Sequence, residues 1–191
     1  MTDSKRKIIV AVTGASGSVY ARKLIASLST MNPAPAEIAV VFSGTAREIW
    51  EAETAGRFEA APPAKIYEND NFLAPFASGS STFDTMIICP SSMGTLGRIA
   101  NGVSDDLICR AADVMLKERR RLIIVPRETP YNLIHIRNME TLTLAGAVIC
   151  PATPSFYNKP VSIDDLVKTV VDRVITLAGF EGDSYHWMED D

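Results

Sequence analysis

Short, unbroken apolar runs recur along the chain and predict the strands of a buried sheet. β-branched residues dominate these runs, and no polar position interrupts them. A strand that is apolar on both of its faces is covered on both sides, which is typical of parallel sheets. The predicted strands are Ile8–Val12, Ile38–Phe42, Met86–Cys89, Leu122–Val125 and Ala147–Cys150.

Segments with helical periodicity separate most of these runs. The stretch Gly56–Ser81 differs, because it is rich in Ala, Pro, Gly and Asn, and we expect a long loop or a broken helix there. Ser162, followed by Asp165 three residues later, resembles a capping box and starts the last helix. The predicted helices are Val19–Ser29, Thr45–Thr54, Leu107–Arg119, His135–Ala145 and Ile163–Ala178.

Strands that alternate with helices predict an α/β fold. Right-handed crossovers between them give a doubly wound, mostly parallel sheet with helices on both faces, similar to the Rossmann type. A length of 191 residues suits one domain. We therefore expect a single domain over residues 1–191, with a C-terminal helix and tail from about residue 163.

The composition narrows the class of partner. The chain is 47% hydrophobic and carries 19 basic against 23 acidic residues, a net charge of −4, which argues against nucleic acid as the main partner. No apolar run approaches the ~20 residues that a membrane span needs. Cys89, Cys109 and Cys150 lie in or near apolar runs and fit no metal site, which predicts buried thiols in a reducing compartment. No signal peptide is visible, so a cytoplasmic protein with a small-molecule partner is expected.

The ends of the predicted strands are the places where a ligand should bind, since doubly wound sheets bind ligands beyond the carboxyl ends of their strands. Three ends offer small hydroxyl residues, and their backbone N–H groups can face an anion at a helix start. Gly and Ser are also ordinary turn residues, so the hypothesis of a phosphate site depends on the agreement of several loops. The five strand ends are Thr13–Ser18, Ser43–Thr45, Pro90–Thr95, Pro126–Pro130 and Pro151–Tyr157.

Two common enzyme classes lack support in the motifs. Gly14–Gly17 follows a strand, but the G-x-G-x-x-G spacing and the Tyr-x-x-x-Lys pair of short-chain dehydrogenases are absent, so a nicotinamide dinucleotide is not favoured. No G-x-S-x-G elbow occurs and the chain has 2 histidines, so a Ser-His-Asp triad is not expected. His135 is predicted to be a buried structural residue of its helix, and His186 lies in the tail.

Arg127 and Glu128 directly follow a predicted strand, between two prolines. One interpretation is that the chain simply returns to solvent there. The other is a guanidinium that binds phosphate, with a carboxylate beside it for proton transfer. Two further cations have the same pair of interpretations: Lys117, the member of the basic run 117–121 nearest the apolar side, and Arg173 on the last helix.

Short motifs spread over nearly the whole chain match one known family in the expected order. They are Thr13–Gly17, Ala77–Ser80, Pro90–Thr95, Arg110–Val114, Leu116–Arg120, Arg127–Pro130, Arg137–Met139, Gly146–Ile149, and Pro154–Tyr157 with Pro160. Through them the chain resembles the UbiX-type flavin prenyltransferases, which were once regarded as subunits of aromatic-acid decarboxylases.

The resemblance implies a fold that binds FMN and a prenyl transfer without metal. A dimethylallyl group would pass from dimethylallyl phosphate to N5 and C6 of reduced FMN, giving prenylated FMN for a separate UbiD-type decarboxylase. The family also implies a homo-oligomer, which is a dodecamer in known relatives.

Site residues are carried over from the family by position. Glu53 resembles a carboxylate that neighbouring subunits contribute, and Phe72 resembles an aromatic wall of the prenyl pocket. Glu128, Glu53 or the departing phosphate would take the proton from C6. FMN would be held by Gly14, Ala15, Ser16, Ser43, Ser92, Met93, Gly94, Thr95 and Arg127. The prenyl phosphate would be surrounded by Lys117, Glu128, Tyr157 and Arg173, in keeping with the cations that a leaving phosphate requires.

Two other functions are compatible with a flavin fold. A related flavin-dependent cysteine decarboxylase carries a Pro-x-Met-Asn-x-x-Met-Trp stretch, which this chain lacks. An FMN-dependent decarboxylase subunit of another kind, or a non-catalytic FMN carrier, would need the flavin loops but not the set Lys117, Glu128, Tyr157 and Arg173. The joint presence of that set favours the prenyltransferase.

Overall fold

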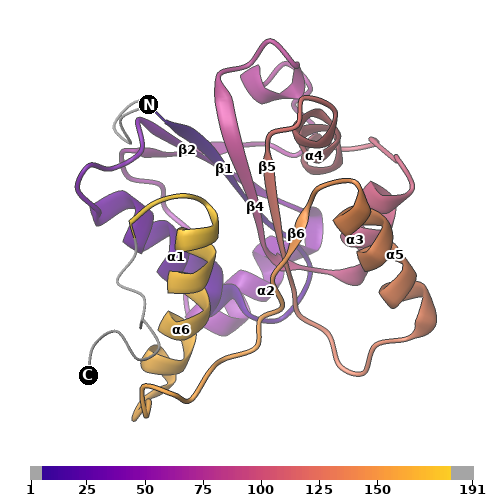
Figure 1. Ribbon diagram of the computed structural model, residues 1–191. Helices are drawn as coiled ribbons and strands as arrows, with labels where there is room; N and C mark the ends of the chain where they lie inside the picture. The colour runs from indigo at the N-terminus through magenta and orange to yellow at the C-terminus, as the bar shows by residue number, and fades with distance from the viewer. Residues whose placement is uncertain (1–5, 182–191) are drawn as a thin grey trace.

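A six-stranded sheet forms the centre of the computed structural model, which describes residues 6–181 (Figure 1). Its strands are β1 Lys7–Val12, β2 Glu37–Phe42, β3 Ala64–Tyr67, β4 Phe83–Ser91, β5 Arg121–Pro126 and β6 Val148–Ile149. The strand order is β3-β2-β1-β4-β5-β6, and every neighbouring pair is parallel. The doubly wound α/β fold is thereby confirmed, and the order reverses between β1 and β4.

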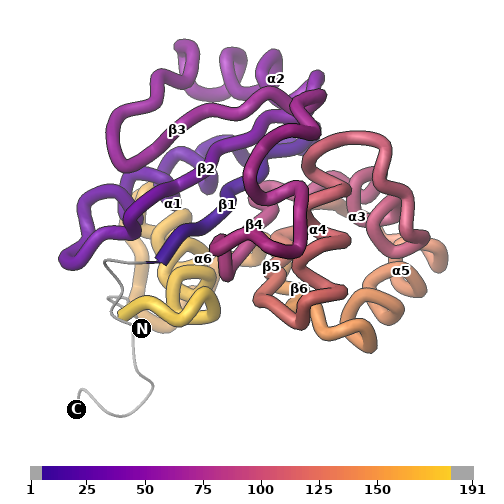
Figure 2. The backbone as a smooth tube through the Cα atoms, turned by 90° about the horizontal axis from the view of Figure 1, so that it is seen from above, coloured from indigo at the N-terminus to yellow at the C-terminus, as the bar shows by residue number. Residues whose placement is uncertain are grey.

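Helices cover both faces of this sheet. They are α1 Ser18–Thr30, α2 Gly44–Thr54, the short 3-10 helix η2 Pro75–Ala77, α3 Met93–Ala100, α4 Leu107–Lys117, α5 Leu133–Leu144 and α6 Ile163–Leu177. In Figure 2, α1 and α6 lie on one side of the row of strands, and α3, α4 and α5 lie on the other. Alternate residues of β1 serve the two cores: Val10 packs on the α1 side, and Ile9 packs on the α4 side.

Two elements of the structure are not predicted by the sequence patterns. β3 lies within Gly56–Ser81, so the expectation of a loop or broken helix is wrong for residues 64–67. An edge strand is short and half exposed, and Lys65 interrupts its apolar pattern. α3 begins directly after β4, and the glycines at its second and fifth positions obscure its helical periodicity.

Side-chain caps set the starts of two helices. The predicted capping box is confirmed: the Asp165 N–H donates to Ser162 Oγ (3.1 Å), and the Ser162 N–H donates to the Asp165 carboxylate (3.0 Å). His135 forms a similar box at the start of α5, where its N–H donates to Asn132 Oδ1 (2.9 Å). His135 is half exposed, so its predicted burial is wrong, because α5 lies at the edge of the sheet and buries just Leu142.

Arg6 ties the beginning of the described chain to its end. Its guanidinium pairs with the Asp84 carboxylate (3.1 Å) and donates to the carbonyls of Ala178 (2.8 Å) and Gly179 (3.1 Å). It also stacks over the Phe180 ring at 4.1 Å. The carbonyls that directly follow α6 thus find a donor next to the start of β1. The predicted tail after residue 181, including His186, lies outside the described residues.

Candidate active site

All five predicted ligand loops leave the sheet at one edge, because all strands are parallel. This carboxyl edge is formed by residues 13–18, 43–45, 90–95 and 126–130 and by the loop that begins at residue 151. Thr13 joins two of its loops where the strand order reverses. Its hydroxyl donates to the Pro90 carbonyl (3.0 Å) and accepts the Ser92 N–H (2.7 Å).

Arg127 is brought to the first of these loops. Its Nε donates to the Ser16 carbonyl (3.0 Å), and its backbone N–H donates to the Ser91 carbonyl (3.2 Å). The side chain is half-buried, and Ser16 is exposed. The guanidinium is therefore held at the carboxyl edge, where it can meet an anion.

The loops after β1 and β2 lie against each other. A Cβ on Gly14 would collide with the Thr45 hydroxyl, so this close approach requires glycine, and Ala15 beside it is buried. Ser43 is the N-cap residue of α2, and its N–H donates to the Val12 carbonyl (2.9 Å). The Ser43 hydroxyl is buried without a hydrogen-bond partner within residues 6–181. An unpaired buried hydroxyl costs free energy, and a ligand oxygen would satisfy it.

The loop after β4 ends in a capped helix start. Ser92 Oγ accepts the Thr95 N–H (3.2 Å) and donates to Thr95 Oγ1 (3.1 Å). Met93 and Thr95 are buried, whereas Gly94 is exposed. The side chains of Met93 and Thr95 therefore support the helix start, and a ligand would meet the backbone around Gly94 and the partly exposed Ser92.

Glu53, near the end of α2, holds the start of α1. Its carboxylate accepts the N–H groups of Gly17 (2.9 Å) and Ser18 (2.7 Å), because α1 has no side-chain cap of its own. Burial alone would raise the pKa of Glu53, but hydrogen bonds from Ser16, Gly17 and Ser18 outweigh burial and hold it below its ordinary value. These contacts lie within one chain, and the role of Glu53 toward a neighbouring subunit stays a prediction.

Glu128 is the less engaged of the two candidate carboxylates. Its side chain is exposed, and Oε1 accepts the N–H of Thr129 (3.0 Å). It directly follows Arg127 at the carboxyl edge. Glu128 can therefore turn toward a ligand without breaking hydrogen bonds to a helix. Glu53 would first have to give up its bonds to the N–H groups at the start of α1.

The loop after β6 docks on α6 and carries Tyr157. The Ser155 N–H donates to Thr169 Oγ1 (3.1 Å), and Arg173 lies one turn further on the same face of α6. Burial raises the pKa of the Cys150 thiol and Arg173 opposes this, which places the guanidinium near the end of β6. Tyr157 and Arg173 are both exposed, so a further molecule can reach them.

Lys117 lies at the opposite edge of the sheet from the carboxyl edge, where the strands begin. It ends α4, four residues before β5 begins at Arg121, and Arg121 pairs in register with Thr85 near the start of β4. A six-residue strand such as β5 spans about 20 Å and separates Lys117 from Arg127. A single chain therefore does not bring Lys117 to the carboxyl edge.

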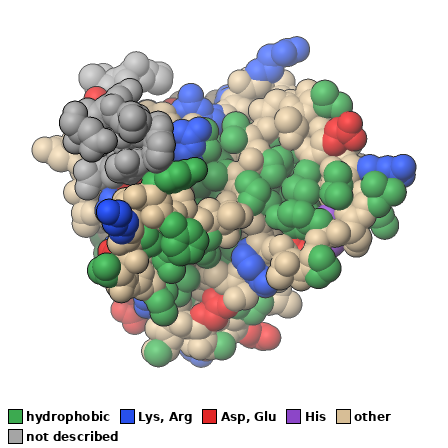
Figure 3. Space-filling view, turned by 60° about the horizontal axis from the view of Figure 1, so that its bottom comes forward, with side chains coloured by type: hydrophobic (Ala, Val, Ile, Leu, Met, Phe, Trp, Pro, Cys, Tyr) green, Lys and Arg blue, Asp and Glu red, His purple; other side chains and the backbone are tan. Residues whose placement is uncertain are grey.

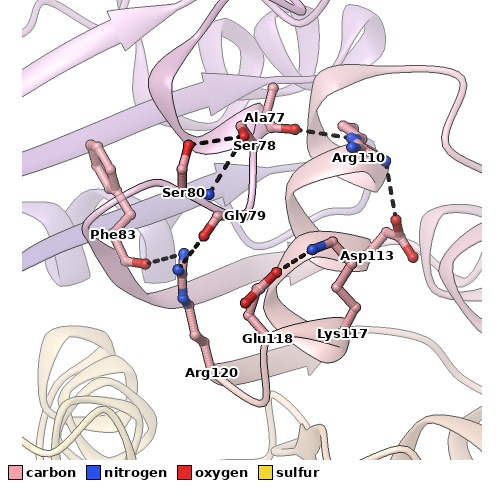
Figure 4. A network of polar contacts seen from close by, with 10 residues as sticks. All are labelled: Ala77, Ser78, Gly79, Ser80, Phe83, Arg110, Asp113, Lys117, Glu118 and Arg120. Atoms are coloured by element: carbon pink, nitrogen blue, oxygen red, sulfur yellow. Dashed lines mark hydrogen bonds and ion pairs between the residues drawn. The ribbon is translucent and has the colours of Figure 1, made fainter.

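A serine-rich turn of residues 78–81 lies beside Lys117 (Figure 4). The Lys117 ammonium pairs with the Glu118 carboxylate and contacts Gly79, where a Cβ would lie 2.6 Å from Lys117 Nζ. The hydroxyls of Ser78 and Ser80 are 3.1 Å apart. The predicted residue Lys117 thus lies beside a serine-rich turn that reasoning from the sequence did not assign to the site. The run of small hydroxyl residues is the signal in the sequence that could have indicated it.

Large apolar side chains are exposed on the described chain. Phe72, in the turn after β3, is 47% exposed, and Leu133 and Ile134 of α5 are 60% and 67% exposed. Figure 3 brings the carboxyl edge forward and shows hydrophobic side chains gathered on this face. Exposed apolar patches mark interaction surfaces, so this side of the molecule is suited to be covered by another molecule.

One cluster of side chains of metal-ligand type occurs within residues 6–181. Asp105, Asp106 and Cys109 lie within 4.8 Å of one another. Arg98 already pairs with both carboxylates (2.7 Å each), so a cation is supplied by the protein itself. The cluster fixes the junction between α3 and α4.

The sequence also predicts buried thiols and no membrane span. Burial of the thiols is confirmed for Cys89 and Cys109, whereas Cys150 is half-buried. Within the described part of the chain, no helix has the length and apolar character that a membrane crossing requires.

Known proteins share both the sequence and the fold of this chain. The family model described as Flavoprotein matches residues 1–175. The flavin prenyltransferase UbiX of Methanocaldococcus jannaschii is 44% identical over 177 residues, which cover 92% of this chain and 94% of that protein. The structure of AnUbiX (PadA1) in complex with FMN and dimethylallyl pyrophosphate has a TM-score of 0.85 at 42% identity, covering 96% of this chain and 97% of the other. A dodecameric FMN-dependent UbiX-like decarboxylase from Escherichia coli O157:H7 has a TM-score of 0.88 at 38% identity, covering 95% and 99%. The chain belongs to the flavoprotein family and, within it, to the UbiX-type flavin prenyltransferases.

Proposed function

We propose that this chain transfers a dimethylallyl group from dimethylallyl phosphate to N5 and C6 of reduced FMN. The observation that carries the proposal is the meeting of hydroxyl- and glycine-rich loops with Arg127 at the carboxyl edge. The relative solved with FMN and dimethylallyl pyrophosphate supports FMN and a dimethylallyl donor that carries phosphate. The prenylated flavin would serve a UbiD-type decarboxylase, and a cytoplasmic location stays a prediction from the sequence.

The carboxyl edge fits the phosphate and ribityl chain of FMN. Arg127 supplies a cation there, and the unpartnered Ser43 hydroxyl supplies a donor. Gly14 allows the backbone to approach closely. We infer that these residues hold FMN together with Ala15, Ser16, Ser92, Met93, Gly94 and Thr95, and that Met93 and Thr95 act by supporting the loop.

The prenyl donor requires a second set of residues. Lys117 lies at the other edge of its own sheet, so it can join a flavin site when another copy of the chain packs against that site. The exposed apolar side chains of α5 and Phe72 offer a surface for such packing. The dodecameric relative agrees with a homo-oligomer. Tyr157 and Arg173 are exposed and would complete the donor site.

These side chains suit a reaction in which phosphate leaves as the allylic carbon becomes cationic. When bound, reduced FMN supplies the nucleophilic atoms and an electron-rich face. Lys117 and Arg173 would stabilise the departing phosphate, with Tyr157 donating a hydrogen bond. Phe72 would face the allyl cation. Glu128 is the better candidate for the base that takes the C6 proton, because Glu53 is held by α1.

Anaerobic incubation with reduced FMN and dimethylallyl phosphate, followed by mass measurement of the extracted flavin, tests the function. We expect the flavin to gain the mass of one dimethylallyl unit less a proton. Unchanged FMN would refute the transfer from this donor and favour a carrier or a decarboxylase subunit.

Two variants test the assignment of the donor site. Arg173→Ala and Tyr157→Phe are expected to abolish prenyl transfer while FMN still binds, because neither residue belongs to the loops assigned to FMN. Loss of FMN binding in either variant, measured by flavin fluorescence, would move that residue into the flavin site.

A further inference from the structure

Arg120 holds the serine-rich turn against α4 (Figure 4). After α4, Arg119 adopts a left-handed conformation (φ 53°), and the Arg120 N–H donates back to the Met115 carbonyl (2.8 Å). This helix ending turns the chain out of α4. The Arg120 guanidinium then donates to the carbonyls of Gly79 (2.6 Å) and Phe83 (3.1 Å).

The same turn is held near the start of α4 by Arg110. Its Nε donates to the Ala77 carbonyl (3.0 Å), and its guanidinium pairs with Asp113 (3.3 Å). Two guanidiniums therefore bind three carbonyls of the segment 77–83. A guanidinium is a rigid, planar fork of donors, so Arg120 can bridge two carbonyls in a way that a lysine cannot.

Arg120 and Glu118, the carboxylate that competes for Lys117, both lie against Gly79: Arg120 donates to the Gly79 carbonyl, and a Cβ on Gly79 would collide with Glu118 Oε1. The hydrogen bond and charge of Lys117 hold the pKa of Glu118 below its ordinary value, and the charge of Arg120 adds to this effect. A phosphate that binds Lys117 must draw the ammonium away from Glu118. Once Lys117 has moved to the phosphate, Arg120 is the cation left to balance the charge of Glu118.

We propose that Arg120 is a positioning residue for the phosphate of the prenyl donor. It fixes Gly79 of the serine-rich turn beside Lys117, and it becomes the counter-ion of Glu118 when Lys117 binds phosphate. Arg120 acts through these groups and does not touch the donor. The proposal rests on the proposed function, in which Lys117 meets the donor in a site formed with another copy.

Steady-state kinetics of the FMN-saturated, full-length protein test this role. Arg120→Gln is expected to raise the KM for dimethylallyl phosphate at least about tenfold, while the Kd for FMN stays within about twofold. Arg119→Gln removes the same charge from the neighbouring exposed position and is the matched control, with wild-type KM expected. Equal KM values for the two variants would overturn the proposal.

A double variant separates the counter-ion role from plain structural support. Adding Glu118→Gln to Arg120→Gln removes the carboxylate that would otherwise retain Lys117. We expect the KM for the donor to fall again by at least about threefold. A structural role alone gives no such recovery, and a KM that does not fall would contradict the counter-ion role.

Gly79→Ala tests the same geometry if Arg120→Gln fails to fold. The added methyl group would collide with Glu118 Oε1 and Lys117 Nζ and displace this pair without removing a charge, so the donor KM should rise while FMN binding is retained. Calorimetry should show weaker binding of inorganic phosphate to the FMN-saturated variant, and wild-type values in both assays would overturn the proposal. Wild-type protein without any prenyl transfer would instead refute the proposed function, so the two failures are distinguishable.

Discussion

Glu53 and Glu128 show how the surroundings of a side chain decide its chemistry. Both are glutamates near the carboxyl edge, but the Glu53 carboxylate accepts backbone N–H groups at the start of α1, whereas Glu128 accepts one from the residue after it. A carboxylate at a helix N-terminus is stabilised in its charged form by those donors and by the helix dipole. Glu53 is therefore suited to fix the loop after β1, and Glu128 is the better candidate for the proposed proton transfer.

Glu53→Gln tests this at the level of stability. The folded pKa of Glu53 is lowered below its ordinary 4.5, so its carboxylate stabilises the fold above that pH, and the contribution is lost as pH falls through the folded pKa. We expect the variant to lose about 1 kcal/mol of unfolding free energy near neutral pH and to approach the wild type in acid. Urea denaturation at several pH values measures this.

Glu48→Gln, an exposed change on the same helix, is the control for that experiment. A loss of stability in Glu53→Gln that is equally large well below pH 4.5 would show that the charge of Glu53 is not responsible.

At the scale of elements, α4 connects the two edges of the sheet. Its start is capped by Asp106, which accepts the Cys109 N–H (2.8 Å) and pairs with Arg98 (2.7 Å). Its end presents Lys117 to the serine-rich turn. The helix therefore sets the position of the proposed donor residues, and its cap contributes to holding them.

Asp106→Ala should destabilise the protein by about 1–2 kcal/mol, because it removes the cap and leaves Arg98 with one carboxylate. Asp106→Asn keeps a capping oxygen and should lose less. Thermal or urea unfolding of both variants checks the order. Equal stability of Asp106→Ala and the wild type would show that the cap contributes little.

The sequence predicts best the strands whose hydrophobic pattern follows from burial alone. β1 and β5 are buried on both faces, so their apolar runs identify them directly. β3 is an edge strand that follows two prolines, and α3 contains two glycines, so local composition conceals both. The gathering of the strand-end loops was predictable because parallel strands end at one edge. The turn at Gly79 was not, because its contacts with Arg120 depend on tertiary packing.

At the scale of the whole molecule, the residues proposed for the active site lie at the two ends of the strands of one sheet. The carboxyl edge carries the flavin loops, and the opposite edge carries Lys117 with its serine-rich turn. No motion of side chains spans a strand length of about 20 Å. The two sets can meet when copies of the chain pack with the opposite edge of one against the carboxyl edge of another.

Complementation between inactive variants tests this arrangement. Co-expressed Lys117→Ala and Arg127→Ala chains should form mixed oligomers with some intact sites, and random mixing gives about a quarter of wild-type activity. Each variant alone should be far less active. The matched control is Arg127→Ala with Ser92→Ala, since both changes affect the carboxyl edge and no site regains both residues. Prenyl transfer by the purified mixture is measured, and absence of recovery in the first pair would contradict shared sites.

The contact of Arg6 with Gly179 and Phe180 indicates that the chain would tolerate circular permutation. The points where the backbone enters and leaves the described fold are neighbours, and they lie at the start of the strands, away from the carboxyl edge. A linker joining these two points would be short and would cross no strand. New chain ends could then be placed in the exposed residues 59–61, between α2 and β3, with every strand pairing kept. The site thus depends on how the strands lie together, and much less on where the polypeptide happens to start.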